Sequence, residues 1–351
     1  MRRAREIYTK VVRSAMVYGA SAWHRPAAAR SRGIATDLAP QQSRCLRTVA
    51  GAYKATPVRS LETETHVPPI DLYLNKAVAD FERRLERTGM GEQIRRACGA
   101  IAGRLRRRGY RAKPGSRGQL LETGVEKAEW AIRWRGGCST TDEAMTRDWE
   151  SRWRADRESE LRRKPLGYRQ PADLSTDFTV GALDRHLGMW KHESSALIQV
   201  RTGKVGLKAF LFQRRVPEIA TPHCRCGLGK ETPVHLALHC PEEREAREQL
   251  RAAVAPKPLR SVMDFAAVTA DPETAKAVVW WFLSLGRIQH FQLAEGIAST
   301  ANRERSDCPP RKKRRKKKKR PAGRAGEEGG GDGPEGAEGA ENPPQSPIWL
   351  G

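Results

Sequence analysis

Apolar residues recur at helical spacing along most of the first 300 positions of this chain. In residues 6–20 they return every three or four positions, which is typical of a helix with one buried face. Residues 40–53 and 70–85 show the same period, and glycines or prolines separate the three segments. No residues before Glu6 could shield these apolar faces, so we expect the segment to be the end of a longer domain.

Tryptophans and arginines alternate in the middle of the chain, where residues 120–164 are expected to form a pair of helices. Trp130 and Trp134 are four residues apart, as are Trp149 and Trp153, and arginines lie between them. Indole rings beside guanidinium groups can stack on nucleobases. At helical spacing they more often pack in a core or against a cation, so packing is the favoured interpretation.

Two more helical patterns follow, in residues 181–212 and 273–297. The second is apolar on nearly all sides, and we expect it to pack over the residues that precede it. No apolar run approaches the roughly twenty residues that a membrane span needs. The patterns predict a mainly α-helical fold in four parts: a helical segment at 1–90, an Arg-rich linker with Trp-containing helices at 91–175, a helical domain with a metal-stapled turn at 176–298, and a disordered tail at 299–351.

The residues between Cys224 and Cys240 concentrate thiols and imidazoles, and we call them the Cys/His segment. They read C-R-C-G-L-G-K-E-T-P-V-H-L-A-L-H-C. Thiolate and imidazole are the donors that zinc takes up in tetrahedral structural sites. A turn of this size cannot bury enough apolar surface to hold itself together, so a metal is the natural staple.

Five potential donors compete for the four places of a tetrahedral site. If residues 234–239 are helical, His235 and His239 share a face while Cys240 points away. Pro241, however, pushes residue 240 out of the α region, which frees Cys240 to fold back. We therefore expect zinc on Cys224, Cys226, His235 and Cys240, with His239 in reserve. The C-x-C spacing is tighter than is usual in structural zinc sites, and the alternative is loop thiols with no metal.

A large excess of cations favours a polyanionic partner. The 65 lysines and arginines against 41 acidic residues give a formal charge of +24, which favours nucleic acid first and an acidic membrane second. Seven cysteines, three of them in the Cys/His segment, do not form a disulfide ladder and fit a reducing compartment. The candidate phosphate contacts are Arg104, Arg106, Arg107, Arg108, Arg201, Lys204, Arg214, Arg215, Arg225 and Lys230.

Several motifs together resemble reverse transcriptases of non-LTR (LINE-type) retrotransposons. The region just after the palm of those enzymes is similar to residues 8–23, 41–57 and 67–74. The C-terminal end of fungal members is similar to residues 201–211, the C-x-C-G at 224–227 and the H-x4-C-P at 235–241. The resemblance implies a thumb or connection segment followed by a Cys-Cys-His-Cys zinc knuckle that contacts template RNA or DNA.

The catalytic carboxylates of that family are missing from this sequence. The polymerase box ends in two adjacent aspartates, and no Asp-Asp pair occurs in the 351 residues. Two-metal phosphoryl transfer needs clustered carboxylates, and the scattered aspartates of residues 91–180 carry no ribonuclease H motif. We therefore expect RNA or DNA binding without enzyme activity and without a small-molecule substrate or a membrane. The alternatives are a nuclear adaptor that binds protein, or a decayed remnant that does not fold stably.

The run Arg311–Arg320, ten consecutive cations, predicts a nuclear location through an import receptor. Fused to a fluorescent reporter, the full chain should accumulate in the nucleus. Replacement of these ten residues by a Gly/Ser stretch of equal length should release the reporter to the cytoplasm, as fluorescence microscopy would show. A reporter that stays nuclear after the replacement would place the signal elsewhere.

Overall fold

Helices account for most of the residues that the structure describes. The computed structural model describes residues 1–26, 33–109, 127–163, 170–288 and 290–291. Within these ranges no strand forms, and an isolated antiparallel bridge pairs His223 with Lys230. The expected mainly α-helical fold is confirmed for this part of the chain, whereas the predicted tail lies outside it.

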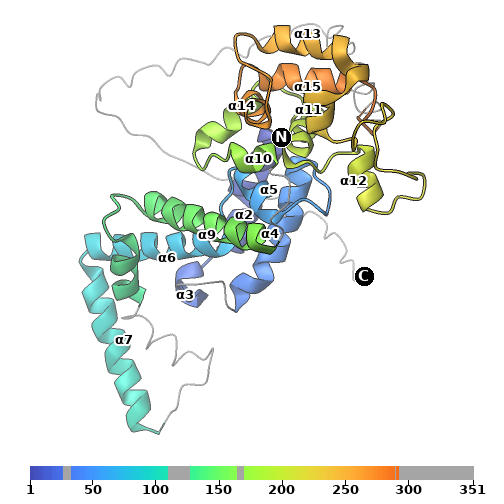
Figure 1. Ribbon diagram of the computed structural model, residues 1–351. Coiled ribbons are helices and arrows are strands. Elements are labelled where there is room, and N and C mark those ends of the chain that lie inside the picture. The colour runs from blue at the N-terminus through green and yellow to red at the C-terminus, as the bar shows by residue number, and fades with distance from the viewer. Residues whose placement is uncertain (27–32, 110–126, 164–169, 289, 292–351) are drawn as a thin grey trace, which may run out of the picture. The chain divides into compact units, whose positions relative to one another are not determined.

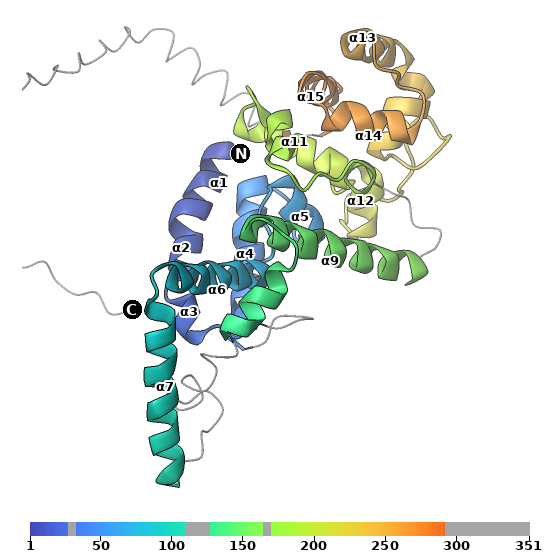
Figure 2. The same ribbon diagram turned by 90° about the vertical axis from the view of Figure 1, so that its left-hand side faces the viewer.

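Figures 1 and 2 show the described elements from two sides. The first half contains α1 (Arg2–Ile7), η1 (Tyr8–Val12), α2 (Arg13–Met16), α3 (Ala20–Trp23), α4 (Ile34–Ala50), α5 (Val58–Glu64), α6 (Ile70–Arg87), α7 (Met90–Arg107), a helical stretch at 127–135 and α9 (Thr141–Arg163). The second half contains α10 (Pro171–Leu174), η2 (Val180–His186), α11 (Lys191–Thr202), α12 (Lys208–Gln213), η3 (His235–His239), η4 (Pro241–Glu243), α13 (Arg244–Val254), α14 (Val262–Ala270) and α15 (Ala275–Ser284).

Two of the expected elements differ from the sequence prediction. Most of the described stretch that was expected to be an Arg-rich linker is the 18-residue helix α7, which contacts α6. The last helix is shorter than the predicted 273–297, because α15 ends at Ser284 and Gly286 follows with φ 65°, a backbone conformation that L side chains rarely adopt. Of the helices described, none combines the length and the apolar character that a membrane span needs.

The tryptophans of the middle segment pack in a core. Trp149 and Trp134 are buried between α6, α9 and the helical stretch at 127–135, and Trp130 stacks on Trp134 with ring centroids 5.3 Å apart. Trp153 lies edge-on to Phe178. The packing interpretation is therefore confirmed for this group, since its two central rings are not open to solvent.

Two other cores connect segments that are far apart in sequence. In one, Leu46 of α4 and Leu61 of α5 pack with Ile198 of α11. In the other, α11, α13, α14 and α15 pack around Leu236 of the Cys/His segment. Residues Met1–Arg303 accordingly cluster as one compact unit, so contacts cross the boundaries predicted at residues 90 and 175.

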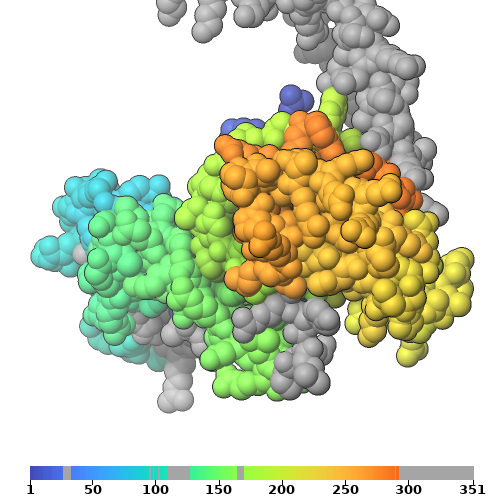
Figure 3. Space-filling model, turned by 45° about the horizontal axis from the view of Figure 1, so that its top comes forward, coloured from blue at the N-terminus to red at the C-terminus, as the bar shows by residue number. Residues whose placement is uncertain are grey.

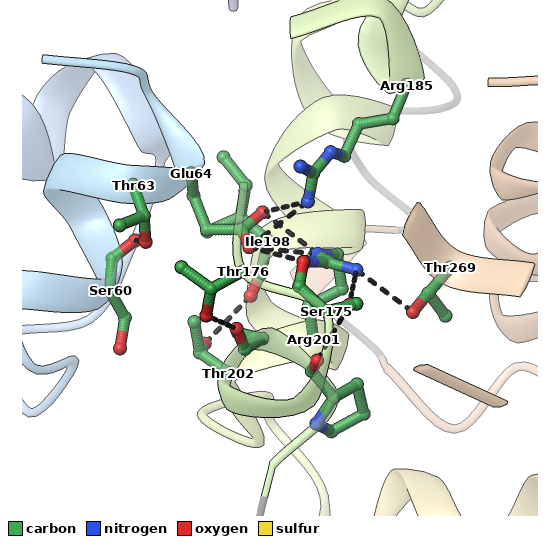
Figure 4. A network of polar contacts seen from close by, with 12 residues as sticks. Ser60, Thr63, Glu64, Ser175, Thr176, Arg185, Ile198, Arg201, Thr202 and Thr269 are labelled. Carbon is green, nitrogen blue, oxygen red and sulfur yellow. Dashed lines mark hydrogen bonds and ion pairs between the residues drawn. The ribbon is translucent and has the colours of Figure 1, made fainter. Parts of the chain in front are cut away.

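A buried ion cluster joins α5 to the second half of the chain (Figure 4). The carboxylate of Glu64, 2% exposed, accepts from Nε of Arg201 at 2.9 Å and from Nη1 of Arg185 at 3.3 Å. Arg201 is 0% exposed, and it also donates to the hydroxyls of Ser175 and Thr269 at 3.0 and 3.1 Å. Arg201 was expected to contact phosphates on the surface; instead it is a structural cation, since only a buried carboxylate offsets its charge here.

Two glutamates of α5 lie in opposite electrostatic surroundings. Burial alone would raise the pKa of Glu64, but Arg201 and Arg185 lower it to about 2. Burial raises the pKa of Glu62 to about 8, which the nearby Arg152 does not prevent. At neutral pH Glu64 is therefore ionised and Glu62 mostly protonated, although both lie in the same short helix.

These two positions offer a matched pair of substitutions. Glu64→Gln should lower the free energy of unfolding at pH 7 by about 3–5 kcal/mol, because two buried guanidiniums lose their counter-charge. Glu62→Gln, which replaces a neutral acid by a neutral amide, should change it by less than about 1 kcal/mol. Urea denaturation followed by circular dichroism measures both values, and equal effects of the two substitutions would contradict the assignment.

The pH dependence of the same measurement provides a second readout. A carboxyl group with a folded pKa of about 2 and an ordinary value of 4.5 stabilises the fold above pH 4.5. That contribution is lost as the pH falls from 4.5 toward 2. The Glu64→Gln variant should lack this part of the acid dependence, and Glu62→Gln should retain it.

Candidate metal centre

A short hairpin turn presents the first two thiols. The bridge between His223 and Lys230 closes it, and the Cys224 N–H donates to the carbonyl of Gly229 at 2.8 Å. Inside the turn the Gly227 N–H donates to the carbonyl of Cys224 at 3.0 Å, with φ 76° at Gly227. Glycine is needed at this position, because other residues rarely adopt that conformation. The turn thus accommodates the unusually tight C-x-C spacing.

A single π-helical turn presents the other two donors. The Cys240 N–H donates to the carbonyl of His235 at 2.8 Å, which is an i to i+5 bond. Cys240 itself is extended, with φ −64° and ψ 119°, as the following Pro241 predicts. Such a turn brings positions i and i+5 close together, whereas an α-helix would separate them. His239 is exposed and does not join the group.

The four expected donors converge in the structure. One donor atom from each of Cys224, Cys226, His235 and Cys240 lies within 4.8 Å of all the others. The sulfurs of Cys224 and Cys240 are 3.7 Å apart, and the Cys226 sulfur is 3.2 Å from Nε2 of His235. With Zn–S bonds of about 2.3 Å, two sulfurs of a tetrahedron are about 3.8 Å apart. The cluster could therefore hold a metal ion, and its donor set and spacing are compatible with zinc.

The protonation states of the donors also bear on metal binding. Burial lowers the pKa of His235, which favours the neutral ring that can offer a lone pair to a metal. Burial raises the pKa of the Cys224 thiol to about 11. An incoming metal ion must displace that proton, as is usual when thiols become ligands.

Two arginines support the cluster from outside it. Arg247 of α13 donates to the carbonyl of Cys240 at 2.7 Å. Arg287, in the turn after α15, has Nη1 3.8 Å from the Cys224 sulfur and also pairs with Glu231 and Glu243. Three thiolates around a dication would leave a net negative charge, which Arg287 would offset. The expectation that the last apolar helix packs over this segment is confirmed, since α15 shares a core with Cys224 and Cys240.

The other predicted cations occupy different surroundings. Arg214, Arg215 and Lys230 are exposed, whereas Arg225 is exposed but paired with Glu242 and Glu243. Lys204 is half-buried, with its ammonium 5.9 Å from the centre of the Phe210 ring. The exposed arginines 104 and 106–108 lie at the end of α7, away from the Cys/His segment in sequence.

Sequence reasoning missed the supporting residues Arg247, Arg287, Glu231 and Glu243. The packing of α13 and of the turn after α15 brings Arg247 and Arg287 to the cluster. Glu231 lies inside the Cys/His segment and Glu243 three residues after it, but their pairing with Arg287 depends on that packing. In comparisons with known proteins, no family model, no curated protein and no solved structure matched the chain. The likeness to reverse transcriptases thus stays a prediction from short motifs.

The cluster predicts one bound zinc ion per chain. Cys240→Ser should remove most of the metal, because the serine oxygen is a poor substitute for a buried thiolate ligand. His239→Gln is the matched control at the neighbouring position, and it should leave the metal content unchanged, since His239 is exposed and outside the cluster. Elemental analysis of purified protein measures the stoichiometry. The reverse ranking of the two variants would overturn this assignment of ligands.

Proposed function

We propose that this chain is a zinc-containing protein that binds single-stranded RNA or DNA with little sequence preference, related to the C-terminal part of non-LTR retrotransposon reverse transcriptases. The observation that carries the proposal is the pairing of a four-donor metal cluster with exposed cations in the same stretch of chain, at Arg214, Arg215 and Lys230. Nuclear import through Arg311–Arg320 would bring the protein to its nucleic acid.

The surroundings of these cations favour a polyanion. No ion pair is recorded for Arg214, Arg215 or Lys230 within the described residues, whereas Arg225 is held by Glu242 and Glu243. Cations without a carboxylate partner can neutralise phosphates without breaking an existing pair. Figure 3 shows the yellow part of the chain, near residue 220 on the colour bar, at the surface of the molecule.

The metal cluster would act as scaffold rather than as catalyst in this function. A site with four protein ligands leaves no open position for water or substrate, which is typical of structural zinc. Its buried donors lie in the same core as α15, so the ion would fix the surface that carries Lys230. The absence of an Asp-Asp pair from the whole sequence is in keeping with binding rather than polymerisation.

Salt dependence tests the proposal. We expect the logarithm of the affinity for a fluorescent 20-nucleotide oligo(dT) or oligo(rU) to fall linearly with the logarithm of the salt concentration. Each phosphate neutralised contributes about 0.7 to the slope on a single strand. The double substitution Arg214→Gln/Arg215→Gln should therefore reduce the slope by about 1.4. The control Arg2→Gln/Arg3→Gln removes an equal exposed charge from α1, and it should leave the slope within about 0.3 of its original value.

A second comparison separates the Cys/His segment from the basic run. A chain that ends at Arg303 keeps the compact unit Met1–Arg303, so it should bind with a flatter slope. Cys240→Ser in that chain should instead weaken binding at every salt concentration, since it removes the scaffold. If the metal-loaded chain ending at Arg303 fails to bind either oligonucleotide at about 50 mM salt, nucleic-acid binding by the folded part is excluded, and binding of a protein partner takes its place.

A further inference from the structure

A hollow of about 650 Å³ lies directly beside the metal cluster. Its walls come from the turn after α11, from the first residues of α12 and from residues 228–235 of the Cys/His segment. Four of the residues that line it are apolar and buried: Val205, Leu207, Phe210 and Val234. The volume lies within the range of about 300–1,000 Å³ that is usual for small-ligand sites.

One apolar side chain at the mouth of this hollow is exposed without an apparent structural reason. Leu228, at the tip of the metal-binding turn, is 77% exposed. The turn fixes the backbone conformation of its neighbours Gly227 and Gly229. Gly229 packs against the ring of His235. Leu228 therefore lines the hollow with an exposed apolar side chain, and it contributes nothing to the core.

Cations flank the same hollow. Lys230 is part of its wall and is exposed. The guanidinium of Arg214 and the ammonium of Lys204 lie 5.8 and 5.9 Å from the centre of the ring of Phe210, one of the lining residues. The one acidic side chain of the wall, Glu231, is paired with Arg287 at 3.3 Å, so its charge is offset. An apolar interior with a cationic rim matches a ligand that has a flat apolar body and flanking negative charges.

We propose that this hollow accepts one unpaired nucleobase of a bound single strand. Leu228 covers one face of the base, Ala209 and Phe210 contact its edge, and Lys230 and Arg214 hold the phosphates on either side. Single strands expose both the bases and the phosphates that such a site requires, whereas paired bases are stacked inside a duplex. The inference rests on the proposed function. It adds a defined binding site for one base and a preference for unpaired nucleotides.

The test uses the full-length, zinc-loaded protein and two strands of equal length and charge. One is a fluorescent oligo(dT) 20-mer, and the other is the same backbone with abasic sites in place of the central bases. Leu228→Ser should weaken binding of the base-containing strand about five- to twentyfold. It should leave the abasic strand unchanged, because phosphates do not contact Leu228. Its zinc content and its salt slope should equal those of the unchanged protein.

Two further variants serve as controls. Val180→Ser removes another exposed apolar side chain, at the start of η2, and should affect neither strand. Lys230→Gln should reduce the salt slope by about 0.7 on both strands alike, because it removes a phosphate contact and not a base contact. If the hollow is a base site, Leu228→Ser should weaken binding of the base-containing strand alone. Lys230→Gln should weaken binding of both strands alike.

The outcomes distinguish this inference from the function on which it rests. If the unchanged protein binds both strands equally tightly, or if Leu228→Ser weakens both by the same factor, the base site is wrong while strand binding stands. If neither strand binds, the proposed function fails. An acidic peptide with a central leucine is a third probe. Should it bind in place of the strands, with a loss in Leu228→Ser, the hollow belongs to a protein partner and the base site is overturned.

Discussion

The convergence of three sulfurs and one imidazole is the constraint on which the second half of this structure depends. Cys224 and Cys240 are buried in the same core as Leu236 and helices α13 and α15. Without an ion, a cluster of thiols in such a place contributes little beyond ordinary packing, and two ionised thiolates 3.7 Å apart would repel each other. A bound dication turns that repulsion into attraction, so its binding free energy adds to the stability of the surrounding core.

Local sequence rules identified the four residues that converge, but not the way in which the backbone brings them together. The restriction that Pro241 imposes on the residue before it was enough to choose Cys240 over His239, and the extended backbone at Cys240 agrees. The π-helical turn was not foreseen, because periodicity in five residues cannot distinguish an i+4 from an i+5 hydrogen bond. The expected helical period was correct for α4 and α6, where long apolar stripes leave no alternative.

Predictions that depended on distant partners were the ones that the structure changed. Arg201 stands in a polar-looking turn sequence, yet its partner Glu64 is 137 residues away. The Arg-rich stretch of α7 was taken for a linker because of its arginines and glycines, although its apolar residues recur at helical spacing. The formal charge of +24 likewise does not indicate which cations are free to meet a partner. Arg152, Arg225 and Arg287, for example, are each paired with a carboxylate of the same molecule. A net charge indicates the class of partner, and only geometry indicates which cations can meet it.

The position of Glu64 in the chain has a consequence for biosynthesis. Its two counter-charges, Arg185 and Arg201, follow it by 121 and 137 residues. At about 5–20 residues per second, a ribosome makes the second of them roughly 7–27 seconds after the glutamate. Until then α5 carries a carboxylate that the finished protein shields from water, so the N-terminal helices cannot complete their core as they emerge. This chain must delay part of its folding until synthesis is well advanced, which is a period in which chaperones would find its apolar faces open.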